Sequence, residues 1–394
     1  MNGGSMDTAD LLLRKLENLD FARGWEDPLV LDEQEKAAGP ADWGKLGMPD
    51  ASLVFQTSGS TGGKTHVVHS SKGLLAAADA VNCWLGLGRD DVFACPLPLL
   101  HVGGFGMWLR AKLAGARFVM SSGKWDATAF VRQLLAEKAT VISLVPTQLH
   151  DIVHAGLACP PRLRFAVVGG GHLLTDLESE SRQLGWPVLG SFGMTETCGQ
   201  IATERPDLAT PGPRWMPMID GWEARATAEG ILETRGPGLL VGKVCQVNGE
   251  WRYLASPLDD GWFATEDHAE IREIGGRMWL RPLGRRDDAI KIRGELVSVS
   301  AASTEIEGLA RGMGLASGTV AIIDQPDPRT GAKLILVGEP DTRDRLPELI
   351  DLFNRRAPAF ARIEQSIIIA EIPRTALGKL RRSALREMVG QRHP

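Results

Sequence analysis

A loop rich in glycine and hydroxyl side chains follows the apolar run "SLVF". The stretch "TSGSTGGKTHVVHS", residues 57–70, offers backbone N–H groups and hydroxyl donors to a phosphate, and its glycines let a ligand approach the backbone. It contains Gly-Lys-Thr, as a Walker loop does, but that loop needs a glycine where this chain has Ser58. Gly59 is one residue too close to the lysine. The spacing therefore argues against a Walker loop and leaves open another phosphate-binding loop or a polar surface turn.

Five further stretches carry residues that could take part in chemistry. They are "VVGGGHLL" (167–174), "SFGMTET" (191–197), "GWFATEDHAEI" (261–271), "GRRDDAIKIRGELVS" (284–298) and "PRTALGKLRR" (373–382). Taken alone, the first is also typical of a tight strand–helix turn and the second of a helix start capped by Thr195. The fourth could be a solvated charged linker between domains, and the last a basic tail.

In their order along the chain, these stretches resemble the acyl-adenylate-forming (AMP-binding) superfamily of acyl-CoA synthetases, luciferases and peptide-synthetase adenylation domains. The resemblance implies that the loop binds the β- and γ-phosphates of ATP. It places Thr195 near the α-phosphate and assigns Glu196 to Mg²⁺, which favours oxygen ligands. The implied ATP- and AMP-binding residues are Thr57, Ser58, Gly59, Ser60, Thr61, Gly62, Lys64, Gly169, Gly170, Gly171, Ser191, Phe192, Gly193, Met194, Asp267 and Arg285.

The later stretches are assigned to the ribose and to a mobile C-terminal domain. The resemblance implies that Asp267 accepts hydrogen bonds from the ribose hydroxyls and that Arg285 contacts ribose or phosphate. Asp287 would be the hinge of the small domain, and Gly294 would lie where the pantetheine arm passes. Lys379 would steady the acyl carboxylate and the charge that develops at the α-phosphorus.

The sequence departs from the family pattern at two positions. Gly63 stands alone before Lys64, where the family commonly has another residue and a proline. Glu266 replaces the family glycine beside Asp267 and adds charge near the nucleotide. The first departure leaves open whether Lys64 contacts phosphate.

The stretch "PLPLLHVGGFGMWLRAKLAGA", residues 96–116, bears on the acid substrate. The resemblance places His101 at the border of the acyl pocket and makes it a catalytic candidate beside Lys379, Thr195 and Glu196. Arg110 lies in a mostly apolar helical pattern, where it either snorkels to solvent or binds a second substrate carboxylate with its planar fork. With "GMTETCGQI", this pattern is similar to the o-succinylbenzoate–CoA ligases of menaquinone biosynthesis. The implied acyl-binding residues are His101, Arg110, Gly193 and Thr197.

The resemblance implies an ATP-dependent acid–CoA ligase with two half-reactions. A carboxylate attacks the α-phosphorus of ATP·Mg²⁺ and gives acyl-AMP and pyrophosphate. The C-terminal domain then rotates, and the thiol of coenzyme A attacks the acyl-AMP and releases AMP. ATP, Mg²⁺ and coenzyme A are therefore expected. Another aryl- or acyl-CoA synthetase and a non-catalytic nucleotide-binding member remain as alternatives.

The hydrophobic pattern predicts an α/β scaffold for these loops. From about residue 53 to 189, apolar runs alternate with amphipathic stretches at 72–84, 104–114 and 127–137, which predicts mostly parallel sheets flanked by helices. Ligands of such sheets gather at the carboxyl ends of the strands. Short strands such as "GILETRG", "GEWRYLAS" and "GRMWLRP" then predict a small antiparallel β unit.

We expect two domains. Residues 1–284 form the N-terminal adenylate-forming domain, which the resemblance implies is shortened at its start relative to the family. Residues 285–394 form a small, mobile α+β C-terminal domain.

Composition narrows the class of partner. The formal net charge of -5 provides no basic excess for nucleic acid or a membrane surface, and no apolar run reaches the roughly 18 residues of a membrane span. The five cysteines show no C-x-x-C spacing, which argues against zinc or a disulfide framework and favours a cytoplasmic location. The expected partners are a small carboxylic acid, ATP and CoA. A homodimer is also expected, to complete the shortened domain.

Overall fold

The computed structural model describes most of the chain, and every structural statement below concerns the described residues. They are residues 16, 29–31, 43–50, 52–58, 64–121, 123–171, 173–212, 214–256, 258–285, 289–292, 295–327, 329–374 and 380–390. The chain forms two compact units. The first comprises residues 1–265 and 270–282, and the second comprises residues 266–269 and 283–394.

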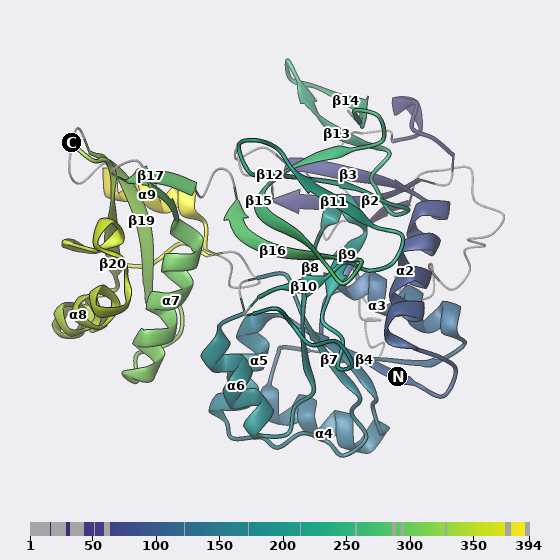
Figure 1. The fold of residues 1–394 in the computed structure, drawn as a ribbon, viewed down its shortest axis with the longest axis horizontal. Coiled ribbons are helices and arrows are strands. Elements are labelled where there is room, and N and C mark those ends of the chain that lie inside the picture. Colours follow the sequence, from purple (N-terminus) through teal and green to yellow (C-terminus); the bar gives the residue numbers. More distant parts are fainter. Residues whose placement is uncertain are drawn as a thin grey trace, which may run out of the picture. The chain divides into compact units, whose positions relative to one another are not determined.

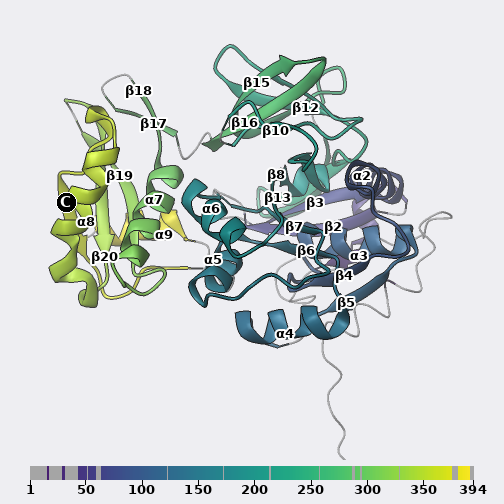
Figure 2. The same cartoon turned by 60° about the horizontal axis from the view of Figure 1, so that its bottom comes forward.

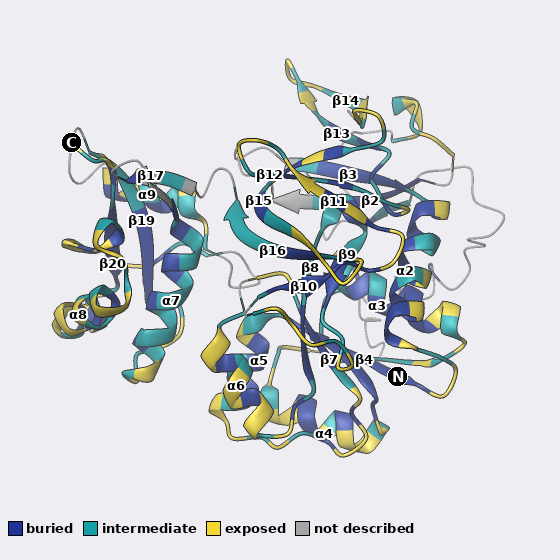
Figure 3. Cartoon of the chain, in the orientation of Figure 1, coloured by how far each residue is buried: buried dark blue, intermediate teal, exposed yellow. Residues whose placement is uncertain are grey.

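A six-stranded sheet forms the centre of the first unit (Figure 1). Its strands lie in the order β5 (Arg117–Met120), β4 (Val92–Cys95), β6 (Val141–Leu144), β7 (Phe165–Val168), β8 (Val188–Met194) and β9 (Gly199–Thr203). Neighbouring strands are parallel except for β8 and β9, which are antiparallel. The short strands are nearly continuous apolar runs because the sheet is buried on both faces (Figure 3).

Helices cover both faces of this sheet, because successive strand residues point to opposite sides (Figure 2). On one face lie α4 (Ala127–Glu137), α5 (Pro146–His154) and α6 (Thr175–Gln183), with Phe130 and Leu149 packed in one cluster with Ile142. On the other face lies α3 (Val102–Ala114), where Met107 packs with Phe93. Helix α2 (Ser71–Leu85) shares a further cluster with α3.

Caps fix the ends of α2. The hydroxyl oxygen of Ser70 accepts from the backbone N–H of Gly73 at 3.2 Å and begins the helix. Gly86 ends it in the left-handed conformation that glycine adopts without strain.

A second sheet carries the strands on either side of the predicted phosphate loop. Its order is β1 (Leu29–Leu31), β2 (Ser52–Ser58), β3 (Lys64–Ser70), β13 (Gly242–Val247) and β14 (Glu250–Ala255). β2 and β3 form an antiparallel pair in which Ser58 lies opposite Lys64. Two sequence-based predictions were wrong here, because "SLVF" does not join the parallel sheet and "GEWRYLAS" does not join the small β unit. The turn Asn248–Gly249 folds β14 back onto β13, and the free edge of β13 pairs with β3.

A third sheet corresponds to the small β unit that the sequence predicts. Its order is β10 (Met216–Pro217), β16 (Arg277–Arg285), β15 (Phe263–Ile274), β12 (Ile231–Arg235) and β11 (Glu223–Ala226). The pairs β10–β16 and β11–β12 are antiparallel.

The second unit contains a three-stranded sheet with helices on both faces. The strands are β19 (Val320–Asp327), β20 (Gly331–Gly338) and β21 (Gln365–Ile368). One face packs against α7 (Val299–Gly312) and α8 (Leu346–Arg356), and the other against α9 (Arg382–Gly390). A hairpin of β17 (Ala289–Ile292) and β18 (Glu295–Ser298) precedes α7.

The α/β class is confirmed, with mostly parallel strands in the central sheet, a small β unit and an α+β C-terminal part. Four 3-10 segments complete the described elements, at Gly44–Leu46, Thr195–Thr197, Pro340–Arg345 and Ala359–Ala361. None of the helices in the described ranges combines the length and apolar character that a membrane crossing requires.

Candidate active site

The strands on either side of the predicted phosphate loop, β2 and β3, pair antiparallel. Thr57 and Ser58 end β2, Lys64 begins β3, and Thr57 lies opposite Thr65. A Walker loop instead joins a strand to a helix, so the strand on its far side agrees with the argument from spacing. The predicted phosphate-binding residues Gly59, Ser60, Thr61 and Gly62 lie outside the described residues.

Two of the segments predicted to bind ATP and AMP meet at the carboxyl ends of β7 and β8. Gly169 comes directly after β7 and packs against Ser191 of β8. A Cβ at Gly169 would lie only 2.6 Å from Oγ of Ser191. The Ser191 hydroxyl donates to the carbonyl oxygen of Val168 at 3.3 Å. Gly170 has a φ of 74°, a left-handed conformation that favours glycine. The third glycine, Gly171, packs near Pro146 at the start of α5.

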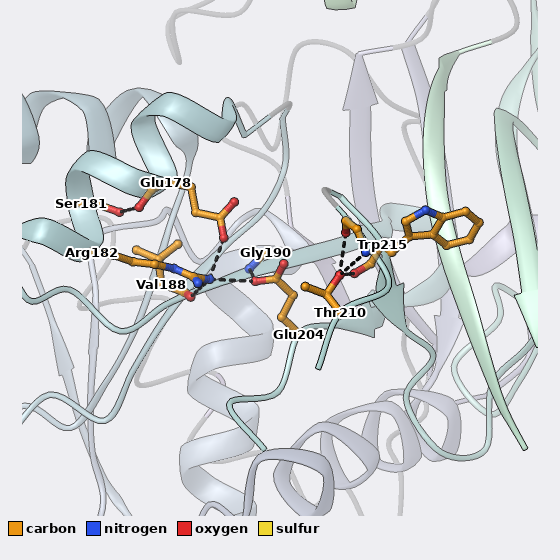
Figure 4. A network of polar contacts seen from close by, with 9 residues as sticks. Glu178, Ser181, Arg182, Val188, Gly190, Glu204, Thr210 and Trp215 are labelled. Atoms are coloured by element: carbon orange, nitrogen blue, oxygen red, sulfur yellow. Dashed lines mark hydrogen bonds and ion pairs between the residues drawn. The ribbon is translucent and has the colours of Figure 1, made fainter. Parts of the chain in front are cut away.

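A polar network fixes the first half of β8 (Figure 4). Arg182 on α6 donates to Oε1 of Glu178 at 2.6 Å and to the carbonyl oxygen of Val188 at 3.3 Å. It also lies 3.6 Å from Oε2 of Glu204, which accepts from the N–H of Gly190 at 2.9 Å. The strand that leads into "SFGMTET" is therefore tied to α6 and to the segment after β9.

The stretch "SFGMTET" forms the end of β8 and a 3-10 turn at Thr195–Thr197, and β9 then returns beside β8. Thr195 belongs to this turn, whose N-cap is Met194, so the alternative that it caps a helix was wrong. Gly193 contacts the returning strand so closely that a Cβ there would lie 1.8 Å from the carbonyl oxygen of Gly199. Phe192, half-buried, lies opposite Ala202.

The hydroxyl of Thr197 closes this turn. It lies 2.7 Å from the carbonyl oxygen of Gly199 and 3.1 Å from that of Met194, and it accepts from the N–H of Met194 at 3.2 Å. Its side chain is fully buried. The structure thus gives Thr197 a role in the shape of the turn.

His69, which the sequence interpretation missed, also holds the turn. Its Nε2 lies 2.7 Å from the carbonyl oxygen of Thr195, and its Nδ1 lies 3.1 Å from Sγ of Cys198. Because a carbonyl oxygen only accepts, Nε2 carries the proton, and Nδ1 then accepts from the thiol. Burial raises the pKa of Cys198 well above its usual value, which agrees with a neutral thiol as donor.

Acidification is expected to weaken the fold through His69. Burial lowers the pKa of His69 from 6.5 to about 4, so the unfolded chain takes up this proton first as the pH falls. The contribution of neutral, buried His69 to the free energy of unfolding is fully present above about pH 6.5. It is lost as the pH falls towards 4, by roughly 3 kcal/mol in total. Urea denaturation between pH 7.5 and 4.5 should show a shallower pH dependence for His69→Gln than for the wild type.

A matched control for this experiment is His154→Gln, because His154 is exposed on α5. This variant should keep the pH dependence of the wild type. Equal slopes for His69→Gln and the wild type would contradict the assignment.

Glu196 pairs with a lysine that the sequence interpretation also missed. Nζ of Lys243 on β13 lies 2.9 Å from Oε1 of Glu196. The carbonyl oxygen of Glu196 accepts from the N–H of Leu240 at 2.8 Å, so the segment before β13 holds the turn as well. The contact joins residues 47 positions apart, and no motif in the sequence indicates it.

The residues around Glu196 suit a metal that arrives with a nucleotide. Within the described ranges, no group of three or more His, Cys, Asp or Glu side chains could hold a metal ion alone. A single carboxylate instead suits a Mg²⁺ ion that takes its other ligands from phosphate and water. Glu196 would hold the metal in this way.

Arg110 is buried, and the alternative that it snorkels to solvent was wrong. Only 5% of the residue is exposed, because the guanidinium points towards β9 rather than away from the sheet. Its Nε donates to the carbonyl oxygen of Gly106 at 3.0 Å, and its Nη1 donates to Oε1 of Gln200. Gln200 lies opposite Gly193, so Arg110 is placed beside the "SFGMTET" turn. His101, at the start of α3, is exposed.

The charge of Arg110 is not balanced by a carboxylate in the described part of the chain. Three of its five guanidinium N–H groups also lack an acceptor there. Burial lowers the pKa of Arg110 to about 10, partly offset by Cys95, so the group remains a cation at neutral pH. A buried cation without a counter-charge is costly, which favours an anionic ligand at this position.

Among the residues predicted for the ribose, Arg285 forms an ion pair with Glu266, the residue that replaces the family glycine. Both lie on the paired strands β15 and β16, and Asp267 is the half-buried neighbour of Glu266. Glu266, which departs from the family pattern, therefore has an ionic partner within the chain. The predicted Asp287, Gly294 and Lys379 lie outside the described residues.

Comparison with known proteins gives concordant matches. The sequence profile of a family described as "AMP-binding enzyme" matches residues 16–238. A 2-succinylbenzoate–CoA ligase of Bacillus licheniformis is 26% identical over 394 aligned residues, covering 96% of this chain and 79% of the relative. The fold is similar to that of O-succinylbenzoate coenzyme A synthetase of Bacillus subtilis in complex with AMP, with a TM-score of 0.71 and 23% identity over 85% of this chain and 68% of that one. The complex of that enzyme with ATP and magnesium gives a TM-score of 0.68 at 23% identity, over 85% and 69% of the two chains.

Proposed function

The chain belongs to the AMP-binding enzyme family, and from this premise we propose that it is an ATP-dependent acid–CoA ligase whose acid is o-succinylbenzoate. The observation that carries the proposal is the meeting of Gly169, Ser191 and the Thr195–Thr197 turn at the carboxyl ends of β7 and β8. Such strand ends are where α/β sheets bind ligands. The ligase names of the matched relatives support the same conclusion.

The reaction would proceed by adenylation and then thioester formation. The loop between β2 and β3 would bind the β- and γ-phosphates. The carboxylate of the acid would attack the α-phosphorus near Thr195 and form acyl-AMP, while the bond between the α- and β-phosphates breaks and pyrophosphate leaves. Mg²⁺ would supply charge neutralisation at the phosphates. In the second step, the thiol of CoA would attack the acyl carbon and expel AMP. The protein contributes mainly positioning and electrostatic stabilisation.

Acid-dependent exchange of pyrophosphate into ATP tests the adenylation step. We expect exchange with o-succinylbenzoate and much less with benzoate, which lacks the second carboxylate. A screen of acids by CoA-thioester formation then identifies the preferred substrate. If no carboxylic acid supports exchange, the proposal fails and a nucleotide-binding role without catalysis takes its place.

The second carboxylate of the substrate would bind Arg110. The guanidinium is charged, desolvated and has N–H donors to spare, and a planar fork suits a carboxylate. Gln200 would orient it through the contact with Nη1. The substrate carboxylate would thus supply the counter-charge that Arg110 lacks in the described part of the chain.

Arg110→Met is expected to raise the KM for the diacid by about tenfold or more, because a charge-assisted hydrogen bond is lost. The KM for ATP should change by less than about twofold, within the effect of an ordinary surface change. Steady-state kinetics with each substrate varied in turn measure both values. The matched control is Lys112→Met on the same helix, an exposed cation stacked 5.1 Å from the Trp108 ring centroid. Equal increases for ATP and acid in Arg110→Met would make Arg110 a structural residue.

We further propose a cytoplasmic location. All five cysteines are free thiols in the structure. Free cysteines are typical of proteins in a reducing compartment.

A further inference from the structure

The ion pair between Glu196 and Lys243 lies on the sheet that carries the phosphate loop. Lys243 lies opposite Val67 of β3 in the antiparallel pair β3–β13. Directly opposite residues of such a pair have their side chains on the same face. Because side chains alternate along a strand, Thr65 shares this face with Val67 and lies about 7 Å nearer to the phosphate loop. Lys243 is thus on the same face as the residue that follows the loop by two positions.

Apolar side chains pack on this face of the sheet near the ammonium group of Lys243. Val67 packs with Leu240 and Phe263, and Met194 packs against the same cluster. Nζ of Lys243 lies 5.8 Å from the ring centroid of Phe263. The stem of the lysine therefore lies over buried apolar side chains, and its charged end points to the Glu196 turn.

Both members of the pair retain capacity for a ligand. The ammonium has three N–H donors, and Glu196 is its single hydrogen-bond acceptor within the described residues. Oε2 of Glu196 likewise has no hydrogen-bond donor there. The side chains are 32% and 22% exposed, so solvent or a ligand can reach them. An ion pair this exposed contributes little to stability.

We propose that Lys243 is a further nucleotide-binding residue, whose ammonium binds a β- or γ-phosphate oxygen of ATP while it remains paired with Glu196. The inference rests on the proposed function, which brings the phosphates to this turn. Glu196 alone would repel the phosphates, since like charges at short range oppose binding. With Lys243 in contact, the carboxylate is already compensated before Mg²⁺ is bound. The triphosphate can then bind without the metal, and Oε2 of Glu196 remains available to the metal.

Isothermal titration calorimetry in EDTA tests this, with ATP, inorganic pyrophosphate and AMP as probes. Lys243→Met is expected to weaken the binding of ATP and pyrophosphate by about ten- to a hundredfold, the usual effect of losing a charged hydrogen bond. AMP binding should stay within about twofold, because AMP lacks the β- and γ-phosphates. Lys243→Arg should keep most of the ATP affinity, because it keeps a cation at this position.

The matched control is Lys72→Met. Lys72 is exposed on α2, which begins beyond the opposite end of β3 from the loop. The Lys72→Met variant removes the same charge at a site away from the loop, so it should bind all three probes as the wild type does.

Three results would overturn the proposal. They are unchanged ATP affinity in Lys243→Met, an equal loss of ATP and AMP affinity, and tighter binding of ATP·Mg²⁺, which would make Lys243 a competitor of the metal. A failure of the proposed function has a different signature, since the wild type would then show no acid-dependent exchange of pyrophosphate into ATP, whatever its affinity for ATP.

Discussion

Replacement of Lys379 by alanine is expected to abolish the formation of acyl-adenylate while largely sparing thioester formation from supplied acyl-AMP. The resemblance to adenylate-forming enzymes places this cation at the carboxylate and the α-phosphorus, where negative charge develops during the first step only. Loss of one positioned charge of this kind costs about 10²–10³-fold in rate. Pyrophosphate exchange measures the first half-reaction, and CoA-thioester release from synthetic acyl-AMP measures the second.

The position of the substitution matters, so a second lysine of the same unit serves as the control. Lys333 on β20 is near the surface and contacts Oε1 of Gln365 at 3.4 Å. Lys333→Ala should leave both half-reactions within about twofold of the wild type, as a surface change normally does. If Lys379→Ala slowed both half-reactions equally, the lysine would not be specific to adenylation.

Gly193→Ala is expected to destabilise the first unit and to remove pyrophosphate exchange. The added Cβ would lie 1.8 Å from the carbonyl oxygen of Gly199, 2.4 Å from its carbonyl carbon and 2.8 Å from Cα of Gln200. These are backbone atoms, which cannot rotate away as a side chain can. Separation of β8 from β9 would cost about 1–3 kcal/mol or more. It would also displace the Thr195–Thr197 turn. Urea denaturation and exchange assays measure the two effects.

Gly88→Ala is the matched control, because it makes the same glycine-to-alanine change at another position. A Cβ at Gly88 would have no atom within 4 Å, and its backbone is not left-handed. This variant should stay within about 0.5 kcal/mol of the wild type and remain fully active. A Gly193→Ala variant of normal stability and exchange rate would show that β8 and β9 can separate without loss of the site.

The local elements of the fold could be predicted from the sequence because their signals are local. The helix expected at 127–137 is α4 with those bounds, and the strands before the glycine turns are β7 and β8. Sheet membership could not be predicted in the same way. Nothing in "SLVF" or "GEWRYLAS" tells which edge each strand will pair with, since pairing depends on β13 reaching β3 across more than 170 residues of chain.

The same limit applies to the candidate site. The motifs named Ser191, Gly193 and Glu196, because their residue types and order are recognisable. His69 and Lys243 were missed, since the contacts that define them join residues 126 and 47 positions apart. Arg110 was found, but its burial could not be predicted, because it depends on Gln200 of β9 lying beside α3.

The order in which the strands pair has a consequence for synthesis on the ribosome. β2 and β3 leave the ribosome early, but the neighbour of β3 on its other side, β13, is completed only at Val247. Until then the nascent chain carries β3 as an open edge, with unpaired N–H and C=O groups that can recruit a strand from another chain. Leu240 and Lys243 are also made late, so the Thr195–Thr197 turn is translated before the groups that hold it. The proposed nucleotide site is therefore assembled only after well over half of the polypeptide has been made, and the edge of β3 is open to other strands during this interval.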